Sequence, residues 1–236
     1  MDTGRKKQLE KFIDVLGLSS FHNLLILDQA LTHSSYANEN KAKHGYYNER
    51  LEFLGDAILD LVVGEYLFLQ YPHMPEGELS KARASVVSEA PLAAVCATFD
   101  MGDYILLGKG ELASGGRKRA SILADAFEAV VGAIYIDSSY EEARKFILHQ
   151  LKDYLSLVPA AITEKITRRC SRNFVQRDGE QKITYVLRRE EGPDHDKTFY
   201  MEVIVAGKVL GEGSGKTKKD AEQHAAHEAL KRLHAI

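Results

Sequence analysis

The sequence has few cysteines and no long apolar run. Its 236 residues include only Cys96 and Cys170, which are too few for a disulfide framework and lack the spacing of a metal-binding motif. No stretch approaches the roughly 20 apolar residues that a membrane-spanning helix needs. Residues 1–12 carry charge with no apolar segment behind them, so no targeting segment is predicted. These absences predict a soluble protein of the reducing cytoplasm, with no membrane partner.

Charge divides the sequence unequally. The whole chain has a formal net charge of −3. Residues 1–158 hold 16 Lys and Arg against 22 Asp and Glu, whereas residues 159–236 hold 15 against 12. The acidic part is expected for a metal site, and the basic part for a polyanionic partner.

The pattern of apolar residues changes at the same boundary. Residues 5–158 show helical spacing with short Gly, Pro or polar breaks, which predicts an all-α domain over residues 1–158. Beyond it, three strand-like runs and a helical pattern follow in order, at residues 183–189, 199–205, 208–213 and 217–233. With a helix before the strands, this α-β-β-β-α order predicts an α+β domain over residues 159–236.

Carboxylates recur along one predicted helix. At about 100° per residue, four of them share one narrow arc: Glu49, Glu52, Asp56 and Asp60. Apolar residues cover much of the remaining surface of this helix, so the acidic stripe is predicted to be recessed. Recessed like charges repel one another, and a divalent cation would stabilise them.

A shorter acidic pattern lies downstream. Asp125 and Glu128 are one turn apart in residues 121–135, which are otherwise almost wholly apolar or small. Packing the two helices together would gather a carboxylate cluster. Oxygen ligands without a nearby Cys or His pair favour Mg²⁺, with Mn²⁺ as a substitute, over zinc.

Four motifs resemble the bacterial ribonuclease III family of double-stranded-RNA-specific endoribonucleases. They lie at residues 31–36, 48–56, 76–80 and 121–128. The resemblance implies metal ligands at Glu52, Asp56, Asp125 and Glu128. It implies catalytic roles for Asp56 and Glu128, with Glu49 and Glu76 in the same catalytic valley.

The resemblance also implies a chemistry and an assembly. Metal-activated water would attack phosphorus in line, leaving 5′-phosphate and 3′-hydroxyl ends. The nuclease domain would form a homodimer whose two sites cut opposite strands. The expected cellular role is the processing of ribosomal RNA precursors and messenger RNA.

The second domain resembles a double-stranded-RNA-binding domain. In such a domain, lysines at a helix N-terminus hold phosphates and a loop between strands reaches 2′-hydroxyls of the RNA. These contacts recognise the shape of the RNA and not its sequence. The predicted contact residues are Pro193, His195, Lys216, Lys218 and Lys219. A glycine-rich basic segment of the first domain, residues 107–119, is either a further phosphate contact or a solvated turn.

Two alternatives stay open. The first is a non-catalytic double-stranded-RNA-binding dimer, and the intact acidic residues argue against it. The second is a metal-dependent hydrolase of another phosphate ester, and the second domain argues against that.

Residues 166–174 depart from the family pattern. The family has a helix resembling Asp-Tyr-Lys-Thr-x-Leu-Gln-Glu here, whereas this chain has Ile-Thr-Arg-Arg-Cys-Ser-Arg-Asn-Phe. With codons chosen from the degenerate set, these residues can be written ATT ACA AGA CGG TGC TCC AGG AAT TTT. One added G in front shifts the frame to Asp-Tyr-Lys-Thr-Val-Leu-Gln-Glu-Phe. We hypothesise a local frameshift, which is either genuine or an error in the recorded gene. Resequencing the gene tests this. Codons that cannot be shifted in this way would refute the hypothesis.

Restoring the nine family-like residues should strengthen RNA binding. Ser171 replaces a buried Leu of the family pattern, a change that costs about 2–5 kcal/mol where the site cannot relax. The restored chain should therefore bind and cut paired RNA at physiological salt, whereas the given chain should need low salt. Equal salt dependence of binding in a filter assay would show that the altered segment does not impair the domain.

Overall fold

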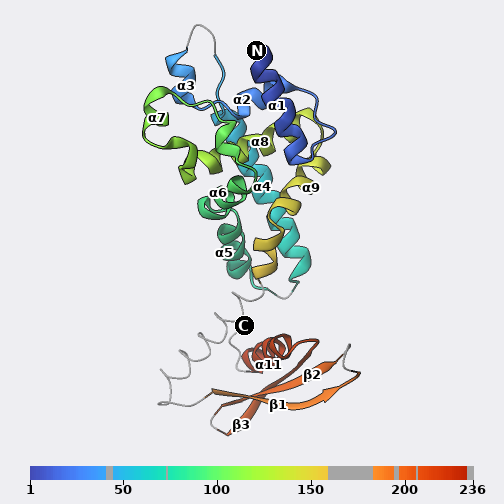
Figure 1. The fold of residues 1–236 in the computed structure, drawn as a ribbon. Coiled ribbons are helices and arrows are strands. Elements are labelled where there is room, and N and C mark those ends of the chain that lie inside the picture. The colour runs from blue at the N-terminus through green and yellow to red at the C-terminus, as the bar shows by residue number, and fades with distance from the viewer. Residues whose placement is uncertain (41–44, 73, 159–182, 194–196, 206, 233–236) are drawn as a thin grey trace. The chain divides into compact units, whose positions relative to one another are not determined.

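The chain folds into two compact units, Met1–Ser156 and Leu157–Ile236. The computed structural model describes residues 1–40, 45–72, 74–158, 183–193, 197–205 and 207–232 (Figure 1). The nine residues 166–174 and His195 lie outside this described part. None of the helices within it is long and apolar enough to cross a lipid bilayer.

The first unit is helical, as predicted. Its α-helices are α1 (Thr3–Leu16), α2 (Leu24–Ala30), α3 (Ser34–Glu39), α4 (Glu49–Gln70), α5 (Glu76–Val86), α6 (Glu89–Thr98), α7 (Lys109–Ala113), α8 (Ala120–Asp137) and α9 (Tyr140–Gln150). Two short 3-10 helices, η1 (Met101–Asp103) and η2 (Gly116–Lys118), lie between α6 and α8. Its described residues pair as β-structure only at one isolated bridge, between Thr32 and Leu106.

Helix α8 forms the middle of this unit. It contacts α2, α4, α6 and α9, and α4 is its main partner (Figure 1). Its largest fully buried side chains are Phe127 and Ile134. Burying such a side chain stabilises a fold by about 1.5–3 kcal/mol, so the apolar faces of α8 hold the surrounding helices together.

Helix α1 is fixed by local and tertiary contacts. The Asp2 side chain accepts a hydrogen bond from the Arg5 backbone N–H at 2.8 Å, which caps the first turn. Gly17 ends the helix in the left-handed region, with a φ of 69°. A largely buried ion pair of 2.7 Å between Arg5 and Asp28 then ties α1 to α2.

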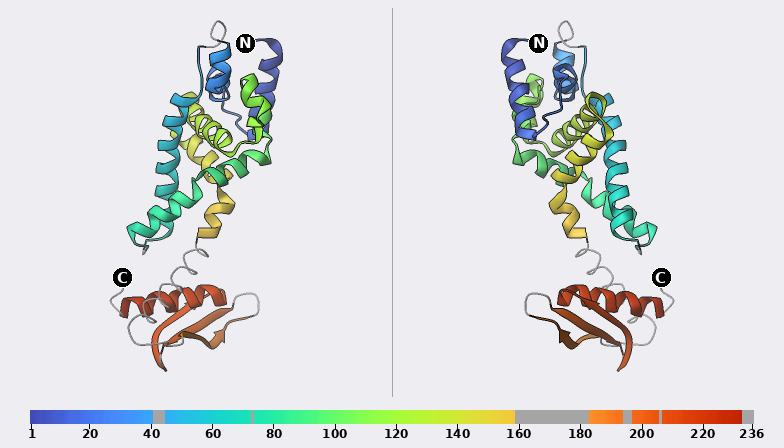
Figure 2. Two further views of the ribbon diagram at one scale, coloured as in Figure 1. Left: turned by 90° about the vertical axis from the view of Figure 1, so that its left-hand side faces the viewer. Right: turned by 90° about the vertical axis from the view of Figure 1, so that its right-hand side faces the viewer.

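The second unit contains a three-stranded antiparallel sheet and a helix. The strands β1 (Ile183–Glu191), β2 (Thr198–Val205) and β3 (Lys208–Gly215) lie in the order β1-β2-β3. Helix α11 (Lys218–Arg232) lies along one face of the sheet (Figure 2). The predicted α+β class is confirmed, and the helix expected before the strands lies outside the described residues.

Small residues let α11 approach β3 closely. Ala221, Ala225 and Ala229 recur every four residues and are buried against the sheet. A Cβ atom on Gly213 would lie 2.6 Å from the His224 carbonyl carbon, closer than real atoms approach. Glycine at this position therefore sets the distance between helix and strand.

Gly213→Ala should destabilise the second unit by about 1–3 kcal/mol, because the added methyl group overpacks the α11 contact. Calorimetry of the whole chain should show a lower melting temperature for the second unit only. Ser214→Ala is the matched control, since Ser214 is the exposed next residue of β3. Equal melting of both variants would contradict this account.

Candidate functional site

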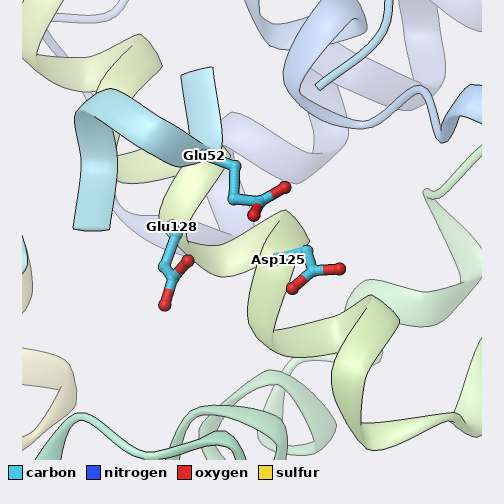
Figure 3. A group of neighbouring side chains, drawn as sticks. All are labelled: Glu52, Asp125 and Glu128. Atoms are coloured by element: carbon cyan, nitrogen blue, oxygen red, sulfur yellow. The ribbon is translucent and has the colours of Figure 1, made fainter. Parts of the chain in front are cut away.

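Three carboxylates meet where α4 and α8 pack together. Glu52 comes from α4, and Asp125 and Glu128 come from α8 (Figure 3). One oxygen of each lies within 4.8 Å of the others. All three residues are half-buried, so the cluster is reachable from solvent but incompletely hydrated. Such a set of hard oxygen donors can hold a divalent cation.

Burial and mutual repulsion raise the pKa of these groups. Burial is the largest cause of the raised pKa at Glu52, Asp125 and Glu128. The pKa of Glu128 is raised to about 8, by burial and then by the charges of Asp56, Glu52, Asp125 and Asp60. Without a cation, the cluster therefore resists full ionisation near neutral pH.

Asp56 and Glu49 lie beside this group of three. Both are exposed, so the prediction that the whole acidic stripe is recessed is wrong for them. The prediction assumed that the apolar faces of α4 are covered, whereas Phe53, next to the acidic stripe, is 80% exposed. Asp56 still raises the pKa of Glu128 and Glu52, and Glu49 raises that of Glu52.

Glu76 belongs to a different helix. It begins α5, is exposed, and its Oε1 accepts a hydrogen bond from Ser80 Oγ at 2.9 Å. Its charge is not among those that raise the pKa of Glu52, Asp125 or Glu128. Within this unit, Glu76 is therefore not part of the carboxylate cluster.

The structure adds two neighbours of Asp125 that the sequence pattern did not indicate. Glu89, at the start of α6, raises the pKa of Asp125, and His33 lowers it. His33 Nδ1 accepts a hydrogen bond from the Ser35 backbone N–H at 3.2 Å, so the imidazole also caps α3. Only tertiary packing brings these two residues to α8, so helical periodicity could not reveal them.

Hydrogen bonds and an ion pair of its arginines hold part of the basic segment 107–119 in place. Arg117 donates to the Gly102 carbonyl oxygen at 2.5 Å, and Arg119 pairs with Glu111 at 2.6 Å. Lys109 and Lys118 are exposed. The two arginines therefore have partners within the segment or beside it, whereas the two lysines have exposed side chains.

The second unit brings two predicted RNA-contact regions together. Lys218, at the start of α11, lies 3.5 Å from Glu190, and Lys197, just before β2, lies 3.6 Å from the other oxygen of that carboxylate. The ammonium group of Lys218 also lies 5.6 Å from the centre of the Phe199 ring. Glu190 thus links the loop between β1 and β2 to the start of α11.

The other predicted contacts lie on the same two regions. Lys216 and Lys219 are exposed beside the start of α11. Pro193 is exposed in the loop after β1.

Comparison with known proteins identifies both units. Residues 23–155 match the family model described as Ribonuclease-III-like, and residues 172–233 match the double-stranded RNA binding motif. Ribonuclease 3 of Desulforamulus reducens is 46% identical over 216 residues, covering 92% of this chain and 88% of that protein. The chain belongs to the ribonuclease III family. It is an endoribonuclease acting on double-stranded RNA, and the non-catalytic alternative is not favoured.

Other members of the ribonuclease III family support this assignment. Ribonuclease 3 of Enterococcus faecalis is 47% identical, covering 90% of this chain and 92% of its own. The solved nuclease domain of ribonuclease III from Campylobacter jejuni superposes with a TM-score of 0.56 at 43% identity, covering 62% of this chain and 95% of that domain. The binding-motif match begins at residue 172, inside the segment that departs from the family pattern.

The contribution of Glu128 to the stability of the metal-free protein should fall as pH rises from about 4.3 to 8. An unfolded glutamate has a pKa of about 4.3, whereas burial and neighbouring carboxylates raise the pKa of folded Glu128 to about 8. Between these values the folded chain retains a proton that the unfolded chain releases, so rising pH favours unfolding. Urea unfolding in a chelator measures this dependence. Glu128→Gln should flatten it and Glu65→Gln should not, whereas identical pH profiles for both variants would refute the assignment.

Proposed function

We propose that this chain is a Mg²⁺-dependent ribonuclease III. In this proposal it cuts paired RNA in the cytoplasm, including precursors of ribosomal RNA and messenger RNA, leaving 5′-phosphate and 3′-hydroxyl ends. The observation that carries the proposal is the meeting of Glu52, Asp125 and Glu128 within 4.8 Å, in a chain that also matches an RNA-binding motif. We assign the nuclease and dimerisation domain to residues 1–158 and the RNA-binding domain to residues 159–236.

The donor set fits a small hard cation. Its three members are carboxylates, without cysteine, and their pKa values are raised mainly by burial, with neighbouring carboxylates adding to the shift. We assign Asp56 as the fourth ligand because it lies one turn from Glu52 and its charge acts on Glu128. Mn²⁺ should substitute for Mg²⁺, since both accept octahedral oxygen ligands.

The proposed site residues have two kinds of role, holding the cation and orienting water. When bound, Mg²⁺ supplies Lewis acidity that activates a water nucleophile and stabilises the leaving 3′-oxygen. Asp56 and Glu128 would hold that cation against the scissile phosphate. Glu49 and Glu76 are proposed to lie in the same catalytic valley of the assembled protein, where exposed carboxylates can orient water.

An exposed apolar stripe on α4 supports a homodimer. Phe53, Leu61 and Phe68 are 80%, 58% and 67% exposed, and helical geometry places them on one face of α4. The acidic stripe lies on the adjoining face. An isologous interface built on this apolar face would bring two acidic sites together, one for each RNA strand. The nuclease domain of ribonuclease III from Campylobacter jejuni has a structurally flexible region that is involved in dimer formation.

The RNA contacts are assigned to the second unit. We propose that Pro193 and His195 reach the minor groove, and that Lys216, Lys218 and Lys219 hold phosphates at the start of α11. The salt bridges of Glu190 with Lys197 and Lys218 support this grouping, because they connect the loop and the helix start.

Glu128→Gln and Asp56→Asn should each lower cleavage of end-labelled paired RNA in Mg²⁺ by about 100-fold or more, because each removes a proposed ligand of the cation that activates the attacking water. RNA binding should remain. Glu65→Gln is the matched control, since Glu65 lies on α4 but pairs with Arg144 at 3.0 Å. Full cleavage by the Glu128 and Asp56 variants would overturn the proposed site.

Phe53→Ala should weaken dimerisation by about 100-fold or more, because an isologous interface loses two buried phenyl groups worth about 1.5 kcal/mol or more each. Sedimentation equilibrium of the whole chain measures this change. Leu25→Ala provides the control, since Leu25 is 70% exposed on α2. If the two variants dimerise equally well, α4 does not form the interface.

A further inference from the structure

Two glycines lie at the closest approach of α4 and α8. A Cβ atom on Gly55 of α4 would overlap the Glu128 carbonyl oxygen and lie 2.5 Å from its carbonyl carbon. A Cβ atom on Gly132 of α8 would overlap the Leu51 carbonyl oxygen and lie 3.2 Å from its carbonyl carbon. The two helix backbones therefore touch at this crossing, with no room for a side chain on either glycine.

Each glycine contacts the backbone at a carboxylate of the cluster. Gly55 touches the carbonyl group of Glu128 itself. Gly132 touches the carbonyl group of Leu51, the residue directly before Glu52. The contact that brings the helices together is therefore also the contact that sets the separation of Glu52 from Glu128.

We propose that Gly55 and Gly132 are positioning residues of the metal site. The proposal rests on the proposed function, because it takes Glu52, Asp125 and Glu128 as ligands. Mg²⁺ requires nearly ideal octahedral geometry with bonds of about 2.0–2.1 Å. A methyl group at the crossing would separate the helices by on the order of 1 Å, which is more than a metal site tolerates.

The separation would act on one ligand in particular. Asp125 and Glu128 share α8, so they move together when the helices part. Glu52 is on α4 and would be withdrawn from them. The effect of Gly132→Ala on metal binding should therefore depend on the presence of the Glu52 carboxylate. A general loss of stability would weaken metal binding whether or not that carboxylate is present.

A second glycine of α4 provides a matched control. At Gly64 the nearest atoms to an added Cβ belong to the Arg83 side chain, at 3.8 and 3.9 Å. Gly64→Ala therefore makes the same chemical change as Gly132→Ala, in the other helix of the pair, without a backbone clash.

The test measures Mn²⁺ affinity from the electron paramagnetic resonance signal of free Mn²⁺, using the whole chain without RNA. Gly132→Ala should weaken binding tenfold or more, and Gly64→Ala should stay within twofold of the parent protein. Glu52→Gln should weaken binding, and adding Gly132→Ala to it should weaken binding no further. Unchanged affinity in Gly132→Ala, or an equal further loss in the Glu52→Gln background, would overturn the proposal.

Thermal unfolding separates positioning from stability. Mn²⁺ should raise the melting temperature of the parent protein and of Ile147→Val, a core variant on α9. At the same Mn²⁺ concentration it should raise that of Gly132→Ala less, because weaker binding stabilises the folded state less. If Gly132→Ala shows no folded state at any Mn²⁺ concentration, the glycine serves the fold and the proposal fails. A parent protein that binds no Mn²⁺ would instead refute the metal site, and this proposal with it.

Discussion

The close packing of α4 against α8 is the constraint on which the first unit depends. Apolar burial along α8 drives these helices together, and fully buried residues such as Phe127, Val130 and Ile134 supply much of that driving force. The same approach forces Glu52 toward Asp125 and Glu128, where burial and repulsion raise the pKa of each group. The core thus holds the acidic residues in an arrangement that they would not adopt alone. A cation bound there would relieve that repulsion, so metal binding would stabilise the folded state.

The fold class was largely predictable, because its determinants are local. Helical spacing of apolar residues covers the first unit, and alternation followed by an alanine-rich helix covers the second. The acidic residues of α4 and α8 were also identifiable, since a carboxylate inside an apolar helix is costly without a partner. The structure brings together Glu52, Asp125 and Glu128, whereas Glu76 begins a separate helix.

What the sequence could not predict depends on tertiary packing. A helical pattern shows that a face is apolar but not whether the same chain covers it, so the exposure of Phe53 was missed. The proximity of Glu89 and His33 to Asp125 arises from segments remote in sequence. In the basic segment, composition could not show that Arg117 and Arg119 are engaged in hydrogen bonds of their own.

Each face of helix α4 has a distinct set of residues. One side packs on α8, a second carries the acidic stripe, and a third carries exposed apolar residues such as Phe53 and Leu61. Because each residue advances the helix by about 100°, a single inserted or deleted residue would rotate every later side chain onto the wrong face. The core face, the acidic stripe and the exposed apolar face would be lost together. The length of α4 between Glu49 and Gln70 can therefore change only at its ends, and evolution can vary this helix by substitution but not by insertion.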